Sequence, residues 1–265
     1  MSQTSLPLAG RNAVIFAATG EISQAVAASL GRLGARLFLS ARNEGRLELA
    51  AKRLEKALGR TVAADIVDAA DTASVEGYLR KIERLIPRFD ITFNGIGLSP
   101  VDAGYGLPST ELKFDQFTGT LRAIAGSQFL TSSLVARRMT TDGGVIILIT
   151  SSLSRHSIPH MAGITAASDA VEGLARVLTA EYAPRGIRVV CARLDSIGET
   201  RTIQLTMAAN AVTAGIPVAE YAERIRKLQV SGRPLTLENA GQAIAFLATE
   251  AASAFTGRVV DIGYP

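Results

Sequence analysis

Short apolar runs alternate with longer segments of helical periodicity along the whole chain. The apolar runs predict seven strands, at Asn12–Ala17, Arg36–Ser40, Thr61–Ala64, Asp90–Asn94, Gly144–Thr150, Ile187–Arg193 and Arg258–Asp261. Segments with apolar residues every three or four positions predict helices at Glu21–Leu33, Glu44–Leu58, Thr72–Ile86, Phe114–Met139, Ala162–Tyr182 and Leu237–Ala248. Strands joined by helical crossovers pair in parallel, so the pattern predicts an α/β fold, a doubly wound seven-stranded parallel sheet with helices on both faces.

The chain contains no repeat, linker or low-complexity segment, and its 265 residues suit one domain over 1–265. Two stretches are longer than simple connections need, the Gly- and Pro-rich Leu98–Thr110 and the partly helical Asp195–Gly232. Each follows a predicted strand, and ligands of open α/β sheets bind beyond the carboxyl ends of the strands. We therefore expect both to cover a site, with 195–232 as a lid, the alternative being surface elaboration.

Composition narrows the class of protein. Hydrophobic residues make up 48% of the chain and aromatic residues only 5%, so small aliphatic side chains must build the core. The net charge of +4 comes from scattered residues, which argues against a nucleic-acid partner. The single cysteine, Cys191, excludes an internal disulfide and a Cys-rich metal site. No apolar stretch reaches the roughly 18 residues of a membrane span, and Met1–Pro7 lacks a signal-peptide core. A cytoplasmic protein without a membrane partner is expected.

Several segments together resemble the short-chain dehydrogenase/reductase family over nearly the whole chain. They are "LAGRNAVIFAATG" (8–20), "LFLSARN" (37–43), "DITFNGIG" (90–97), "GGVIILITSS" (143–152), "AVEGLARVLTAEYAPRGIRVV" (170–190) and "GRPLTLENAGQAIAFLATEAASAFTGRVVDIG" (232–263). The resemblance implies a Rossmann-type fold and hydride transfer between a nicotinamide dinucleotide and a carbonyl or carbinol carbon. It also implies a homo-oligomer, a dimer or tetramer, packed through the helices at 114–139 and 162–182.

The segment that resembles the family's phosphate-binding turn is altered. Where the family has three glycines, this chain has Ala17, Gly20 and Ser23, while Thr19 and Ile22 complete the predicted cofactor-binding turn. Such a turn exposes backbone N–H groups at a helix N-terminus to a diphosphate. Glu21 would repel that diphosphate; alternatively, it only complements the positive end of the helix.

The adenosine side of the predicted site is closer to the family. Arg42, just beyond the second strand, suits the 2′-phosphate of NADP(H), and the place where NAD-users tend to carry Asp holds Ala41. Asp65, after the third strand, resembles the adenine contact, and Asn94-Gly95 opens a turn that the family also has. NADP(H) is therefore the expected cofactor. The alternative makes Arg42 a solvated residue at a helix start.

The catalytic positions depart most from the family. The resemblance places Ile164 where the family has its proton-transferring Tyr and Ser168 where it has the supporting Lys. Ser151 matches the serine that orients the substrate oxygen, and Ile124 stands for the Asn that holds a water. Because Ile neither donates a proton nor orients a water, and a positioned acid contributes roughly 10²–10⁴ in rate, we expect no ordinary carbonyl reduction.

Other polar residues could serve instead. His156 and His160 lie between Ser151 and Ile164, and histidine transfers protons near neutral pH; incidental loop positions are the alternative. Arg193 and Asp195, at the end of the sixth strand, are site-facing, unless they form a surface pair. The histidine spacing without carboxylates predicts no metal site. A greasy substrate pocket is expected from Leu98, Met161, Ile164, Leu194 and Met207.

Three interpretations follow. The first is an atypical NADP(H)-linked oxidoreductase for an apolar small molecule, such as a conjugated enoyl compound, with Ser151 or His160 stabilising an enolate oxygen. The second is a catalytically silent binding protein or oligomer partner. The third is a lyase or isomerase that uses His160 or Asp195 as a base. A fold does not choose among them.

Overall fold

A computed structural model describes residues 5–140, 143–227 and 233–263. The described residues form one parallel sheet in the order β3-β2-β1-β4-β5-β6-β7, which confirms the predicted fold class. Its strands are β1 (Asn12–Phe16), β2 (Arg36–Ala41), β3 (Ala63–Ile66), β4 (Ile91–Asn94), β5 (Gly144–Ser151), β6 (Ile187–Leu194) and β7 (Val259–Ile262). The order reverses between β1 and β4, which makes that point the topological switch of the sheet.

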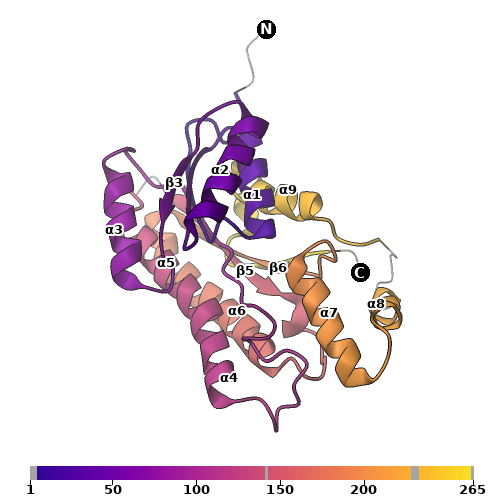
Figure 1. Cartoon of the computed structure of the whole chain (residues 1–265). Helices are drawn as coiled ribbons and strands as arrows, with labels where there is room; N and C mark the ends of the chain where they lie inside the picture. The colour runs from indigo at the N-terminus through magenta and orange to yellow at the C-terminus, as the bar shows by residue number, and fades with distance from the viewer. Residues whose placement is uncertain (1–4, 141–142, 228–232, 264–265) are drawn as a thin grey trace.

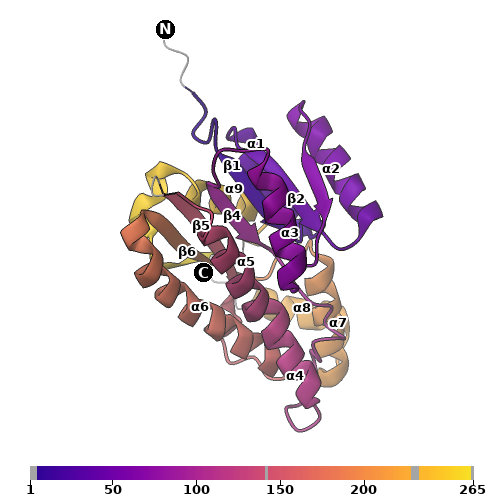
Figure 2. The ribbon, with the colours of Figure 1, turned by 90° about the vertical axis from the view of Figure 1, so that its left-hand side faces the viewer.

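Helices cover both faces of this sheet (Figures 1 and 2). On one face lie α1 (Glu21–Arg32), α2 (Glu44–Leu58) and α9 (Leu237–Leu247). On the other lie α3 (Thr72–Glu83), α4 (Phe114–Leu121), α5 (Ser127–Ala136) and α6 (Ala162–Tyr182). Strand residues alternate between two buried clusters: Ile15 packs with the first group of helices, and Val14 and Phe16 pack with the second. This alternation is the two-residue period of a strand buried on both faces.

Two of the predicted elements differ from the structure at positions that carry predicted site residues. The helix predicted at Phe114–Met139 is divided by a π-helical segment, Arg122–Gly126, where the Ser127 N–H reaches back five residues to the carbonyl of Arg122. One extra residue per turn barely changes apolar spacing, so periodicity missed it. The third strand lies at Ala63–Ile66 rather than Thr61–Ala64, so Asp65 is within β3, opposite Ser40, and not after it.

The predicted lid carries two helices, α7 (Arg201–Ala214) and α8 (Val218–Arg226), which stand apart from the main layers (orange in Figure 1). Thr200 caps α7, and the helix ends at Gly215, whose φ of 66° is the left-handed conformation that favours glycine. Residues 228–232 of the predicted lid lie outside the described residues. Within the described part of the chain, no helix is both long and apolar enough to cross a membrane.

Candidate functional site

The turn after β1 keeps a shape that normally requires glycine. Ala17 has a φ of 52°, in the left-handed region, which costs an L-residue roughly 1–2 kcal/mol. The turn is fixed by hydrogen bonds from Gly20 N–H to the Ala17 carbonyl (3.0 Å) and from Ala18 N–H to the Ser40 carbonyl (2.9 Å). Strain of this kind persists only where surrounding structure imposes it, so the turn is held for a reason other than local preference.

Helix α1 starts at this turn. Its N-cap is Gly20, and no side chain among the described residues caps it, whereas Asn43 caps α2 and Asp71 caps α3. The first N–H groups of α1 are therefore available to an anion. Gly20 has a φ of −70°, so its backbone does not require glycine; its value lies in the absence of a side chain at the rim.

Ser23 is not presented to a ligand. Its side chain is buried, and its Oγ finds no partner among the described residues. It faces the turn after β4, where a Cβ on Gly95 would collide with Ser23 Oγ. Gly95 thus allows α1 to approach β4 closely, and the third family glycine position is used for packing here.

The two predicted adenosine contacts lie near each other in the sheet, because Asp65 of β3 pairs with Ser40 of β2, two residues before Arg42. Arg42 is exposed between β2 and the Asn43 cap and forms no ion pair with any described residue. Asp65 is ion-paired to Lys81 of α3. The Asp65 charge also acts on Tyr78 of α3. The pKa of Tyr78 is raised well above its ordinary value, first by burial and then by that charge. The adenine role of Asp65 stays a prediction.

Asn94 is the best-anchored of the predicted cofactor residues. It is buried at the end of β4, where its Nδ2 donates to Ser127 Oγ (3.3 Å) and Thr131 Oγ1 (3.1 Å) of α5. Its Oδ1 accepts the N–H of Ile96 (2.9 Å). These bonds fix the turn at Asn94-Gly95 against both the sheet and α5.

Of the four positions that the resemblance assigns to catalysis, two are apolar and three are buried. Ile164 and Ile124 are 9% and 7% exposed and belong to one buried cluster. Ser168 is 1% exposed, and its Oγ has no partner in the described part of the chain. Ser151 ends β5, is half-buried, and its Oγ accepts the Leu153 N–H at 3.3 Å.

No lysine replaces the ammonium group that is absent at position 168. The five lysines lie on α2, on α3, at the start of α4 and just after α8, namely Lys52, Lys56, Lys81, Lys113 and Lys227. A tyrosine does lie nearby: Tyr105 packs against the same cluster as Ile164, and burial raises its pKa above the ordinary value. Its phenol therefore stays protonated without a cation beside it.

Three segments distant in sequence meet over the carboxyl ends of the strands. Gly106, in the predicted covering segment 98–110, donates its N–H to the His160 carbonyl (3.0 Å) and accepts from Thr213 Oγ1 of α7 (2.9 Å). Asn210 of α7 contacts Met161 Sδ at 3.9 Å. The predicted lid therefore touches the residues that it was expected to cover.

The predicted pocket residues divide between two places. Met161 and Ile164 share one cluster, and α7, which carries Met207, lies against Met161. Leu194 belongs to the cluster on the opposite face of the sheet. Leu98 is half-buried in the segment that follows β4.

His160 is a half-buried residue in an unusual conformation, with a φ of 66° and an Nδ1 that finds no partner among the described residues. An open hollow of about 480 Å³ lies beside it, lined by the turn at 153–162 and by α6. His156, also at this hollow, is exposed. Among the residues described, no group of three His, Cys, Asp or Glu side chains could hold a metal ion.

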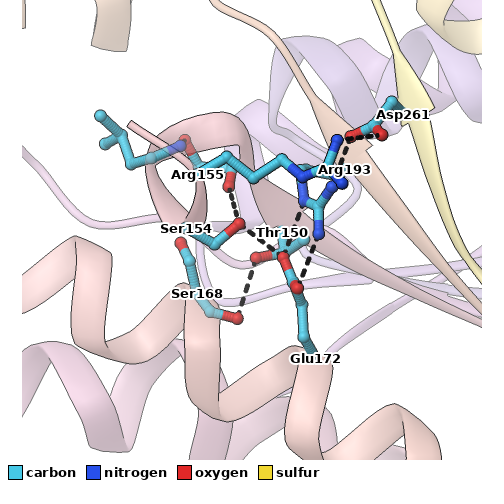
Figure 3. Close-up of polar contacts among 9 residues, drawn as sticks. Thr150, Ser154, Arg155, Ser168, Glu172, Arg193 and Asp261 are labelled. Carbon is cyan, nitrogen blue, oxygen red and sulfur yellow. Dashed lines mark hydrogen bonds and ion pairs between the residues drawn. The ribbon is translucent and has the colours of Figure 1, made fainter. Parts of the chain in front are cut away.

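A charged cluster lies at the ends of β5, β6 and β7 (Figure 3). Arg193 donates from Nε and Nη2 to the two carboxylate oxygens of Glu172 on α6 (2.8 and 2.7 Å) and from Nη1 to Asp261 Oδ1 (2.6 Å). Ser154 Oγ donates to Glu172 Oε1 (2.5 Å), and Arg155 pairs with Asp261 Oδ2 (2.9 Å). The proposed surface pair of Arg193 and Asp195 was wrong: Arg193 is 7% exposed and pairs with Glu172 and Asp261.

The charge states of this cluster follow from its hydrogen bonds. Burial opposes ionisation of Glu172, but the bonds from Arg193 and Ser154 outweigh it and hold the pKa of Glu172 below its ordinary value. The bonds to Glu172, and then to Asp261, raise the pKa of Arg193. The sequence did carry a signal: Val189, Cys191 and Arg193 share one face of a buried strand, so the Arg193 guanidinium had to find carboxylate partners.

Comparisons with known proteins extend along the chain. The family model described as "Enoyl-(Acyl carrier protein) reductase" matches residues 17–264. D-threitol dehydrogenase of Mycolicibacterium smegmatis is 28% identical over 262 residues, 97% of this chain and 94% of that protein. The NADH-dependent enoyl-[acyl-carrier-protein] reductase FabI of Escherichia coli is 24% identical, with 96% and 93% covered. A crystal structure of NAD⁺-bound xylitol dehydrogenase is similar in fold, with a TM-score of 0.91, 21% identity and 97% and 99% covered.

Proposed function

Since the chain belongs to the short-chain dehydrogenase/reductase family, a family of oxidoreductases, we propose that it is an atypical NADP(H)-linked reductase of an apolar enoyl or carbonyl compound. One observation carries the proposal: the strained turn at Ala17 and the uncapped start of α1 retain a diphosphate-binding shape, while the proton-transfer positions are aliphatic. A reaction that needs little acid catalysis fits that combination.

The residues on the cofactor side fit a dinucleotide in shape. The first N–H groups of α1 would take the diphosphate, and the turn that Asn94 fixes after β4 would border the cofactor. Exposed Arg42 would take the 2′-phosphate of NADP(H), because a guanidinium binds phosphate in a bidentate manner. Glu21, on the rim, opposes the diphosphate by its charge.

When bound, NADPH supplies a hydride, which would go to the β-carbon of a conjugated substrate. Ser151 Oγ would then donate a hydrogen bond to the enolate oxygen, and water would deliver the proton to the α-carbon. Ile164, Met161 and Met207 would contact the apolar part of the substrate. Neither step requires a Tyr or Lys at positions 164 and 168.

The test begins with binding. Titration with NADPH and NADH, followed by nucleotide fluorescence, should show tighter NADPH binding, and Arg42→Ala should remove that preference. Arg53→Ala, on the exposed side of α2, is the matched control and should leave it unchanged. No binding of either nucleotide at millimolar levels would overturn the proposal, and an NADH preference would overturn its NADP(H) part.

Activity comes next, on a panel of enoyl and carbonyl compounds with apolar tails. Ser151→Ala should lower kcat by roughly 10²–10³-fold on an active enoyl substrate, because it removes one oxyanion donor. KM should change little. Activity that is indifferent to Ser151 would remove the assigned role of that hydroxyl.

A silent binding protein is the second candidate, favoured by the burial of Ile124 and Ile164 in one packed cluster. Tight NADPH binding with no hydride exchange on the whole panel would favour it. The strained backbone of His160 and its unpartnered Nδ1 favour a third, a lyase or isomerase. Turnover abolished by His160→Ala but indifferent to nucleotide would support that one.

We also infer a homo-oligomer, in a cytoplasmic setting, with a small apolar molecule as the other partner. Exposed apolar side chains on the helices expected to pack subunits support the oligomer: Phe114 is 77% exposed, Phe129 53% and Val177 54%. Light scattering should give a dimer or tetramer, and Phe129→Glu should shift it toward monomer. A monomeric parent protein would overturn this inference.

A further inference from the structure

We infer that Glu21 is an internal latch: its carboxylate holds the lid helix α7 over the start of α1, and a dinucleotide must displace it in order to bind. The inference rests on the proposed function for the identity of the nucleotide. It deepens that function by adding a device that couples nucleotide binding to the lid.

The latch is one hydrogen bond between segments that are far apart in the sequence. Glu21 Oε2 accepts the backbone N–H of Arg201, the first residue of α7, at 3.0 Å across 180 positions of sequence. Thr200 Oγ1 accepts the N–H of Ile203 in the same first turn. The start of α7 is therefore capped by its own threonine and by a carboxylate from α1. A carboxylate at a helix N-terminus is stabilised by the N–H group and by the helix dipole together.

A second carboxylate ties the same segment to α9. Glu199 Oε2 accepts the N–H of Leu237, the first residue of α9, at 2.6 Å. Helix α9 is in turn fixed against α1, because Gly241 lies so close to Ala25 that an added Cβ would be 2.6 Å from the Ala25 carbonyl oxygen. The segment that leads into α7 is thus pinned to the α1–α9 pair from both sides.

The position of Glu21 sets up a competition. It is the first residue of α1, the helix whose N-terminus lacks a side-chain cap in the described structure and would take the diphosphate. A carboxylate and a diphosphate repel each other when they are a few ångströms apart, so Glu21 and a diphosphate at the start of α1 would compete. Nucleotide binding must therefore push Glu21 away from Arg201.

Loss of the bond between Glu21 and Arg201 would also affect the predicted substrate pocket. Helix α7 also contacts Met161 through Asn210 and Gly106 through Thr213, so a shift at its start changes the cover over the predicted pocket. The nucleotide-free protein keeps this cover latched by Glu21. The nucleotide-bound protein must hold α7 by other contacts or leave it free to move.

The experiment compares Glu21→Gln and Glu21→Ala with the parent protein. Asp115→Asn is the matched control, because it also removes one exposed carboxylate from the first turn of a helix, α4, and this carboxylate makes no hydrogen bond to α7 within the described structure. Two quantities are measured: the Kd for NADPH and for NADH, and the rate of amide hydrogen exchange over residues 195–214 without nucleotide.

We expect Glu21→Ala to lower the Kd for NADPH by about tenfold or more, because one repulsive charge and one competing hydrogen bond are removed. Exchange over 195–214 should be faster in this variant, with Glu21→Gln between the two and Asp115→Asn like the parent. Unchanged affinity and unchanged exchange would overturn the latch while the proposed function stands. If neither the parent nor the variants bind nucleotide, the proposed function fails and the competition falls with it.

Discussion

The carboxyl ends of the strands form two regions that differ in kind: a first rim at β1, β2 and β4, and a second rim at β5, β6 and β7. At the first, backbone groups dominate: a left-handed Ala17, an uncapped helix start and an Asn94 bonded to three groups. At the second, side chains dominate: Ile164 and Ser168 stand where the resemblance expects Tyr and Lys, beside the largely buried pair of Arg193 and Glu172. The turn at Ala17 keeps its left-handed shape without glycine because backbone hydrogen bonds hold it, whereas a side-chain function depends on the single residue that carries it.

The largest effect should come from breaking the ion cluster. Arg193→Met takes two charged donors from Glu172, whose side chain is 12% exposed and keeps only the Ser154 hydrogen bond, and removing one partner of a fully buried pair destabilises by up to about 3–5 kcal/mol. Urea unfolding measures it. Arg224→Met, which breaks the exposed pair with Glu220, should cost less than about 1 kcal/mol. Equal losses in the two variants would show that the cluster is not a stability centre.

A smaller effect tests the packing behind the first rim. Gly241→Ala should destabilise by about 1–3 kcal/mol, because its Cβ would press on the backbone of Ala25 and separate α9 from α1. Gly77→Ala, in α3 with open space around the added Cβ, should instead stabilise by roughly 0.5–1 kcal/mol. Thermal unfolding of both variants measures this difference in stability. If both substitutions raised the stability, the close approach of α9 to α1 at Gly241 would be contradicted.

The pH dependence of Glu172 gives a finer test. Its pKa is lowered in the folded protein, so its contribution is present above the unfolded value of about 4.3 and is lost as the pH falls toward the native pKa. Glu172→Gln should cost about 1 kcal/mol at neutral pH, because Asp261 still pairs with Arg193. The difference between parent and variant should shrink below about pH 4. A gap that stays constant down to pH 3 would exclude this linkage.

The smallest effect concerns two hydroxyls at the second rim. Ser168→Ala should change stability by less than about 0.5 kcal/mol, since its Oγ has no partner in the described structure. Thr150→Val should cost about 1 kcal/mol, because Thr150 Oγ1 donates to the Ser168 carbonyl at 3.1 Å. Chemical denaturation separates the two, and a larger loss at Ser168 would mean that its hydroxyl has a partner after all.

Apolar periodicity was enough for the fold, because the inner strands, such as β1 and β4, are buried on both faces and every crossover contains a helix. This periodicity predicted the order of helices and strands along the chain. It did not predict the π-helical turn at 122–126, because that turn changes the spacing of apolar residues only slightly. Arg193 could have been predicted as buried from its strand face, but its partners Glu172 and Asp261 come from elements whose neighbourhood only the folded sheet defines. The same applies to Glu21 and Arg201, whose contact spans most of the chain.

Arg193 pairs with carboxylates on two different elements, and this affects local unfolding at the edge of the sheet. Strand β7 is four residues long and lies at the edge of the sheet, and its Asp261 side chain is 54% exposed, so fraying should begin there. When β7 peels away, Arg193 keeps both bonds to Glu172 and is never left as a bare charge in the interior. The edge can therefore open and close on its own, without committing the rest of the domain to unfold.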